Sequence, residues 1–165
     1  MNNVDIHKNF YSDGTLHSIE IFKDGKRNGV CKWYYESGML EAEISFVDDK
    51  RDGIYKSYYE SGLIWQEAEY KNDLQEGLTR WYYESNSLAA EVNYANGMLD
   101  GKTTWYYENK AIKLIENFHQ GRLEGKSVGY DENGKIVFEE EFKEGVKIAC
   151  KRYDSEGNIL MSQSF

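Results

Sequence analysis

Few side chains in this sequence suit metal or thiol chemistry: three histidines, His7, His17 and His119, and two cysteines, Cys31 and Cys150. Their spacing matches no common metal-ligand motif. In the stack of hairpins that the repeat spacing indicates, His7 and Cys31 occupy the same column of adjacent hairpins, about 10 Å apart. A shared Zn²⁺ needs bonds of about 2.0–2.3 Å. We therefore expect no metal site and no cofactor.

Catalytic motifs are also missing. Most serines fall in predicted turns, where the hydroxyl supports the loop. The sequence contains no GxSxG, Walker or HExxH pattern. A catalytic site requires unlike residues that converge, whereas this sequence repeats like residues in rows. We predict that the protein is not an enzyme.

Tryptophan, tyrosine and glutamate recur in a pattern suited to non-covalent binding. Trp and Tyr serve as anchors at interaction surfaces, and acidic side chains steer a basic partner. A simpler interpretation remains open, in which the rings cover the outer face of a sheet and the carboxylates keep that face soluble. The candidate partner-binding residues are Trp33, Tyr35, Trp65, Trp81, Tyr83, Trp105, Tyr107, Glu41, Glu43, Glu67, Glu69 and Glu91.

A second glutamate series precedes a predicted turn in each repeat. We interpret its members as solvated turn residues. They are Glu36, Glu60, Glu84, Glu108 and Glu132.

A repeat of 24 residues must position all these side chains. Self-similarity at a fixed short period indicates stacked copies of one supersecondary unit. The leading glycines are Gly29, Gly53, Gly77, Gly101 and Gly125. One aromatic series is Phe10, Tyr34, Tyr58, Tyr82, Tyr106 and Tyr130, and a second is Phe22, Phe46, Tyr70, Tyr94, Phe118 and Phe142. Between them runs the aliphatic series Leu16, Leu40, Ile64, Leu88, Ile112 and Ile136.

Each unit is predicted to be one β-hairpin. In the copy 29–52, residues 30–35 are rich in aromatic and β-branched side chains, and residues 40–46 alternate apolar with polar side chains. Between these strands lies a position that favours positive φ, as a three-residue hairpin loop requires. That position holds Gly14, Gly38, Gly62, Asn86, Lys110 and Gly134 in successive copies. A polar turn, residues 48–52, leads to the next glycine.

The expected register assigns the two faces. A bend at Ser37 places Tyr34 opposite Leu40, Lys32 opposite Ala42 and Val30 opposite Ile44, and this face is predicted to be the core. The outer face then pairs Trp33 with Glu41 and Cys31 with Glu43. Ser57, which stands where the neighbouring copies have Trp, would pair there with Trp65. The bulky ring would then have moved to the partner strand, and the volume on that face would be kept.

The predicted fold class is all-β: about seven 24-residue hairpins in one elongated, twisted antiparallel meander sheet with almost no helix. We expect a single repeat domain over residues 1–165. Its copies are predicted at 5–28, 29–52, 53–76, 77–100, 101–124, 125–148 and 149–165.

The unit G-x-x-x-W-Y-Y-E-S-G-x-L resembles the MORN repeat, in the variant of the bacterial YwqK family of antitoxin-like proteins. The resemblance covers roughly residues 5–165 and is carried by residues 34–38, 58–62, 82–86 and 106–109. It implies antitoxin, scaffold or membrane-proximal roles. The Gly-rich tail of the better-known eukaryotic repeat is missing, which favours the bacterial variant and disfavours lipid binding.

Charge and composition limit the partners. The sequence has 29 acidic and 20 basic residues, a formal charge of -9, which disfavours nucleic acid and anionic membranes as partners. The N-terminus shows no apolar run typical of a signal peptide or anchor. Cys31 and Cys150 lie five repeats apart, on the order of 50 Å, so free thiols and a reducing cytoplasm are expected.

Two functional hypotheses follow. The first is a cytoplasmic antitoxin or immunity protein that neutralises a basic toxin by stoichiometric binding, since toxins that act on nucleic acid tend to be basic. The second is a structural scaffold for protein assembly. An antitoxin should bind one basic protein at one patch, whereas a scaffold should bind several partners or itself. Homo-oligomerisation is left open.

Overall fold

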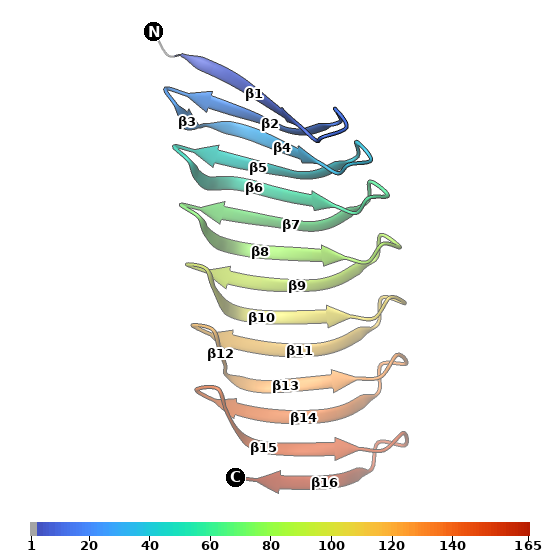
Figure 1. Ribbon diagram of the computed structural model, residues 1–165. Coiled ribbons are helices and arrows are strands. Elements are labelled where there is room, and N and C mark those ends of the chain that lie inside the picture. The colour runs from blue at the N-terminus through green and yellow to red at the C-terminus, as the bar shows by residue number, and fades with distance from the viewer. Residues whose placement is uncertain (1–2) are drawn as a thin grey trace. The chain divides into compact units, whose positions relative to one another are not determined.

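In the computed structural model, residues 3–165 are described and contain β-strands, turns and no helix (Figure 1). Met1 and Asn2, with which the predicted domain begins, lie outside the described residues. The sequence divides into two compact units, Met1–Gly77 and Leu78–Phe165. The all-β prediction is confirmed. The prediction of a single domain stays a prediction.

In the first unit, hydrogen-bonded neighbours follow the order β1-β2-β4-β5-β6-β7, and the described pairs are antiparallel. The two-residue strand β3 pairs with β2. The strands are β1 (Val4–Phe10), β2 (Leu16–Lys23), β3 (Lys26–Arg27), β4 (Gly29–Tyr34), β5 (Leu40–Val47), β6 (Lys50–Tyr58) and β7 (Ile64–Lys71). Strand β8 (Leu74–Tyr82) crosses the boundary between the units.

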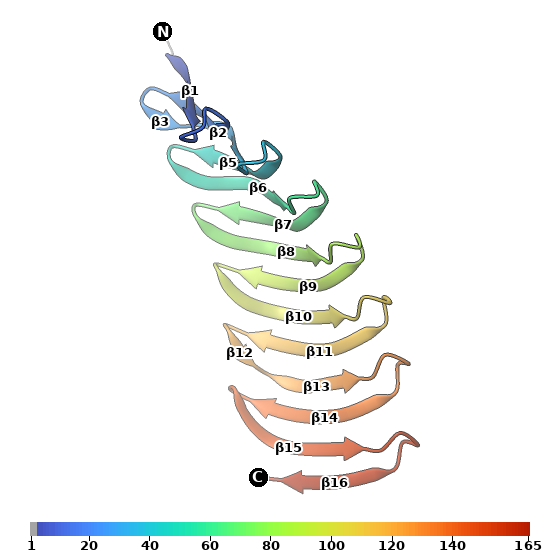
Figure 2. The same ribbon diagram turned by 45° about the vertical axis from the view of Figure 1, so that its right-hand side comes forward.

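In the second unit, the order is β8-β9-β10-β11-β13-β14-β15-β16, and the short strand β12 pairs with β11. The strands after β8 are β9 (Leu88–Ala95), β10 (Met98–Tyr106), β11 (Ile112–His119), β12 (Arg122–Leu123), β13 (Gly125–Tyr130), β14 (Ile136–Lys143), β15 (Val146–Tyr153) and β16 (Ile159–Ser164). Within each unit the strands bow, with hairpin bends at one end and turns at the other (Figure 2).

The hairpin bends form where the sequence predicts them. The Gly38 amide donates to the Tyr35 carbonyl, and the Tyr35 amide donates to the Met39 carbonyl, so three residues make the bend. Gly38 has φ +83°, and even Lys110 takes φ +72° at the equivalent position. The expected positive φ at this position is therefore confirmed.

At the opposite end of the strands the turns are tighter than expected. Asp48 and Asp49 have φ of +49° and +68°, and Val47 pairs with Lys50 directly across them. Two residues with positive φ make the turn that best matches the twist of neighbouring strands. The polar turn predicted over residues 48–52 thus takes two residues, and the rest belongs to β6.

One extra residue in β5 overturns the predicted faces. Tyr34 pairs with Leu40 as expected, but Trp33 pairs with Ala42 and Cys31 with Ile44, because a bulge leaves Glu41 unpaired between them. The other described hairpins show the same irregularity beside their bends. A one-residue shift in register moves side chains to the opposite face. The predicted pairs of Trp33 with Glu41, Cys31 with Glu43, Lys32 with Ala42 and Val30 with Ile44 are therefore wrong.

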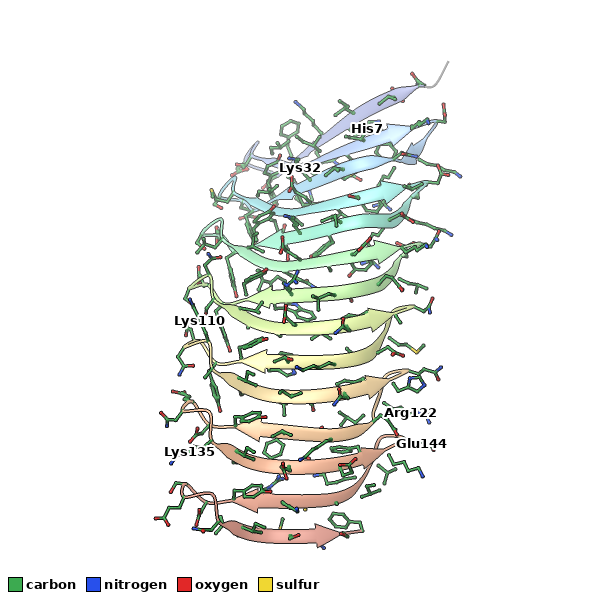
Figure 3. All side chains as sticks on the ribbon, turned by 180° about the vertical axis from the view of Figure 1, so that it is seen from behind. His7, Lys32, Lys110, Arg122, Lys135 and Glu144 are labelled. Carbon is green, nitrogen blue, oxygen red and sulfur yellow. The ribbon has the colours of Figure 1, made fainter. Side chains whose placement is uncertain are left out.

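The register defines two faces in each unit. The aromatic face carries Trp33, Ile44, Phe46, Tyr55 and Tyr70 in the first unit, and Tyr94, Trp105, Leu114, Phe118, Phe138 and Phe142 in the second. The charged face carries Lys32, Glu43, Lys56 and Glu67 in the first unit, and Glu91, Thr104, Lys126 and Glu139 in the second. No second layer covers either face of the described units (Figure 3).

Small side chains form most of the core, on the aromatic face. Cys31 and Ala42 are buried, and Trp33 and Phe46 contact each other with ring centroids 6.2 Å apart on the same face. Phe46 is buried as predicted. Tyr34, by contrast, is only half-buried and lies on the charged face, because the bulge moves Ala42 and Ile44 to the other face and leaves it paired with Leu40 alone.

Bulky and small residues compensate each other across the hairpins. Trp33 pairs with Ala42, whereas Gly129 pairs with Phe138 at the equivalent position. A Cβ added to Gly129 would lie 2.1 Å from Phe138 Cε1, so the ring occupies the space above the glycine. An exchange of volume that was not predicted thus occurs at this pair, whereas the one predicted between Ser57 and Trp65 is wrong. Ser57 pairs with Ala42 and Gln66 and not with Trp65.

We predict that Gly129→Ala lowers the free energy of unfolding by about 1–3 kcal/mol, as overpacking does. Gly134→Ala is the matched control: its Cβ would meet nothing within 4 Å, and only the φ of +80° opposes it. Urea unfolding compares the two. Because the strained φ alone costs Gly134→Ala about 1–2 kcal/mol, the outcome that would contradict the packing of Phe138 over Gly129 is a Gly129→Ala variant as stable as the unmodified protein.

Candidate protein-interaction surface

The predicted tryptophan anchors do not share one environment. Trp33 and Trp105 lie on the aromatic faces of their units, where Trp105 pairs with Ala90 and Leu114 and is 41 % exposed. Trp81, in β8, is half-buried. Trp65 occupies the unpaired bulge position of its hairpin and is 44 % exposed. The faces holding Trp33 and Trp105 are therefore the ones on which rings gather.

The second tyrosine of each pair links neighbouring copies of the repeat. The hydroxyls of Tyr35, Tyr83 and Tyr107 each donate a hydrogen bond, at 2.7–2.8 Å, to the backbone carbonyl of the residue 23 positions ahead. Tyr11 does the same to Tyr34 at 2.6 Å. Because the hydroxyl is used within the fold, these tyrosines present at most part of their rings to a partner.

Three of the predicted glutamates lie on the charged faces and are paired within the protein. Glu43 accepts from Lys32 Nζ at 2.7 Å, Glu67 from Lys56 at 3.0 Å and Glu91 from Arg80 at 3.0 Å. Tyrosine hydroxyls add to two of these pairs, Tyr58 to Glu43 and Tyr106 to Glu91. The hydrogen bond from Lys32 is the main cause that lowers the pKa of Glu43.

The other two predicted glutamates have no cationic partner among the described residues. Glu69 is exposed opposite Ile54 on the charged face, and Glu41 is the half-buried bulge residue. The expected stripe of tryptophans among glutamates is thus not one surface. Trp33 and Trp105 point to one side of the sheet in their units, and Glu43, Glu67 and Glu91 point to the other.

Carboxylates that the sequence reasoning missed lie on the aromatic face of the second unit. Glu116 is opposite Thr103, and Glu140 is opposite Ser127. The signal was available in the repeat itself, because the positions 24 residues apart hold Glu20 in the first copy, Ile44, Ala68 and Val92 in the next three, and Glu116 and Glu140 in later ones. A carboxylate that replaces an apolar residue in a repeat indicates a local requirement beyond folding.

No group of three or more His, Cys, Asp or Glu residues in the described part of the sequence could hold a metal ion. Both cysteines are buried free thiols, and burial raises the pKa of Cys31. Within residues 3–165 there is no helix that could span a membrane.

Alkaline pH should reveal the pairing on the charged face. Burial, together with the hydrogen bond to Glu43, raises the pKa of Tyr58 to about 12. A tyrosine in the unfolded protein ionises near pH 10. The contribution of protonated Tyr58 to the free energy of unfolding is therefore complete below about pH 10 and is lost as the pH rises to about 12. We predict that Tyr58→Phe flattens the loss of stability across this range, measured by urea unfolding.

The matched variant Glu43→Gln keeps the Tyr58 hydroxyl but removes the neighbouring charge. It should make Tyr58 ionise at lower pH, as seen in the tyrosinate absorbance. An unchanged titration in Glu43→Gln would show that the carboxylate does not act on Tyr58.

Comparison with known proteins agrees with this geometry. The family model described as "MORN repeat variant" matches residues 27–48, 51–72, 75–96, 99–120 and 123–144, more than half of the sequence. The matched segments start 24 residues apart, the same period as the hairpins. No curated protein matches the sequence. Such repeats indicate a repeat-based protein-interaction module, and the chain belongs to the MORN repeat variant family.

Proposed function

We propose that this protein is a non-enzymatic antitoxin or immunity protein that neutralises a basic protein by covering it. The observation that carries the proposal is the uncovered aromatic face. Its rings stand over a layer of small side chains, and no second protein layer packs on them in the described units. Uncovered aromatic side chains are the groups that protein interfaces use as anchors.

The charge distribution supports a basic partner. Basic side chains on the charged faces, such as Lys32, Lys56 and Arg80, are neutralised by the protein's own carboxylates. At the hairpin bends, by contrast, five glutamates are exposed and none forms an ion pair with a described residue: Glu36, Glu60, Glu84, Glu108 and Glu132. Together with the net charge of -9, these free carboxylates would accelerate encounter with a cationic protein.

Occlusion requires no reaction, and the proposal assigns none. The buried free thiols, Cys31 and Cys150, suit a reducing compartment, which supports a cytoplasmic location. Neither nucleic acid nor a membrane is proposed as a partner, because the unpaired charge at the bends is mainly acidic.

A scaffold is the second candidate, and one observation favours it. Val30 and Ile54 lie on the charged face of the first unit and are 44 % and 52 % exposed. A second apolar surface, separate from the aromatic face, would allow two partners to bind at once. A scaffold should therefore bind several proteins or itself.

The test is co-expression with the product of the adjacent gene, followed by calorimetry on the purified pair. We expect a single 1:1 complex, and Trp105→Ala should weaken it by at least about 2 kcal/mol if Trp105 is an anchor. The matched control is Ile54→Ala, an exposed apolar side chain on the other face. Reversing the charge of Glu84 and Glu108 should slow association, most clearly at low salt.

Unchanged affinity in a Trp33→Ala, Trp105→Ala double variant would show that the partner docks elsewhere. A loss confined to Ile54→Ala, or self-association seen by light scattering, would favour the scaffold.

A further inference from the structure

A polar row crosses the middle of the aromatic face in the second unit. Thr103 on β10 is opposite Glu116 on β11, and Ser127 on β13 is opposite Glu140 on β14. The register of β11 and β13 pairs Leu114 with Gly129, which places Glu116 beside Ser127. Glu116 therefore lies between two hydroxyl-bearing side chains.

Both hydroxyls lack a partner. Thr103 and Ser127 are 2 % and 3 % exposed, and neither Thr103 Oγ1 nor Ser127 Oγ has a hydrogen-bond partner among the described residues. Buried hydroxyls are normally satisfied, because an unmade hydrogen bond in a low dielectric is unfavourable. Two such atoms on either side of one carboxylate indicate a group that binds between them.

Glu116 forms no ion pair with any described residue. Its neighbour Glu140 accepts from Lys147 Nζ at 2.8 Å and from Arg152 Nη2 at 2.6 Å. Glu116 accepts a hydrogen bond from the Trp105 side chain, and burial, with a smaller contribution from Glu140, raises its pKa. Since Lys147 and Arg152 are both engaged by Glu140, Glu116 is the acceptor left for an outside cation.

The Trp105 side chain lies beside this carboxylate and donates a hydrogen bond to it. It is 41 % exposed and lines a small cavity of about 170 Å³ with Tyr83, Tyr106, Lys113 and Leu114. A cation that replaced the indole as donor would leave the ring beside it, where a ring face attracts positive charge.

We propose that Glu116, Thr103 and Ser127 bind the ammonium group of a lysine side chain from a partner protein, with Trp105 packing on its alkyl chain. An ammonium group has three N–H donors, and the row supplies three acceptors side by side. A guanidinium group is a planar fork suited to bidentate contacts, which a row of single acceptors does not match. This inference rests on the proposed function only in assigning the lysine to a protein.

The test uses the whole protein and the peptide acetyl-Gly-Lys-Gly-amide, with a norleucine peptide that lacks only the ammonium group. Binding is followed by NMR of the tryptophan indole N–H groups, and the Trp105 signal is assigned by its loss in Trp105→Phe. We expect the lysine peptide to shift the Trp105 signal saturably at millimolar concentration. The norleucine peptide should leave it unchanged.

Two variants make the test specific. Glu116→Gln keeps the shape of the side chain and should weaken the lysine peptide at least about tenfold, as loss of a charged hydrogen-bond acceptor does. Glu141→Gln, on the charged face of β14, should bind like the unmodified protein. Thr103→Val with Ser127→Ala should also weaken binding while the thermal midpoint shows that the protein remains folded.

Absence of a saturable shift, an equal shift from the norleucine peptide, or unchanged binding in Glu116→Gln would overturn the proposal. Tighter binding of an arginine peptide would overturn the assignment to lysine. If the lysine peptide binds as expected but the adjacent-gene product does not bind, only the proposed antitoxin function fails.

Discussion

A single unpaired residue beside the hairpin bend, in each hairpin whose register is described, determines which side chains meet in this protein. In the hairpin of β4 and β5 that residue is Glu41, and it moves Ala42 and Ile44 to the side of the sheet that holds Trp33. Because side chains alternate along a strand, one inserted residue exchanges the faces of every residue beyond it. The rings, the small buried residues and the ion pairs all take their positions from this bulge.

A sheet that is one layer thick must shield its backbone with its own side chains. The buried positions hold small residues such as Cys31, Ala42 and Ala68, and larger side chains on the same face cover them. Arginine side chains extend this cover in the first unit, where Arg27 lies 4.3 Å from the centroid of Phe46 and Arg51 lies 4.2 Å from that of Tyr70. The arrangement stabilises the sheet and still leaves ring surface available for a partner.

The repeat also explains why residues suited to binding are used for folding. The hydroxyls of Tyr35, Tyr83 and Tyr107 bond to the backbone of the next copy, and Glu43, Glu67 and Glu91 each pair with a cation on the other strand of the same hairpin. A feature that recurs from copy to copy serves the hairpin or the contact between hairpins, since both recur at every step. Function is more readily sought where copies differ, as they do at Glu116.

The sequence alone determined the features that depend on local chemistry. The 24-residue period, the hairpins, the positive φ at Gly38 and Lys110, and the pairing of Tyr34 with Leu40 follow from turn preferences and strand alternation within a few residues. Only the tertiary structure decided which residues lie on each face. The bulge position holds residues as different as Glu41, Trp65 and Lys113, so no preferred residue type marks it in the sequence. The tertiary structure also decided the surroundings of Glu116, since the hydroxyls beside it come from strands that only the sheet brings together.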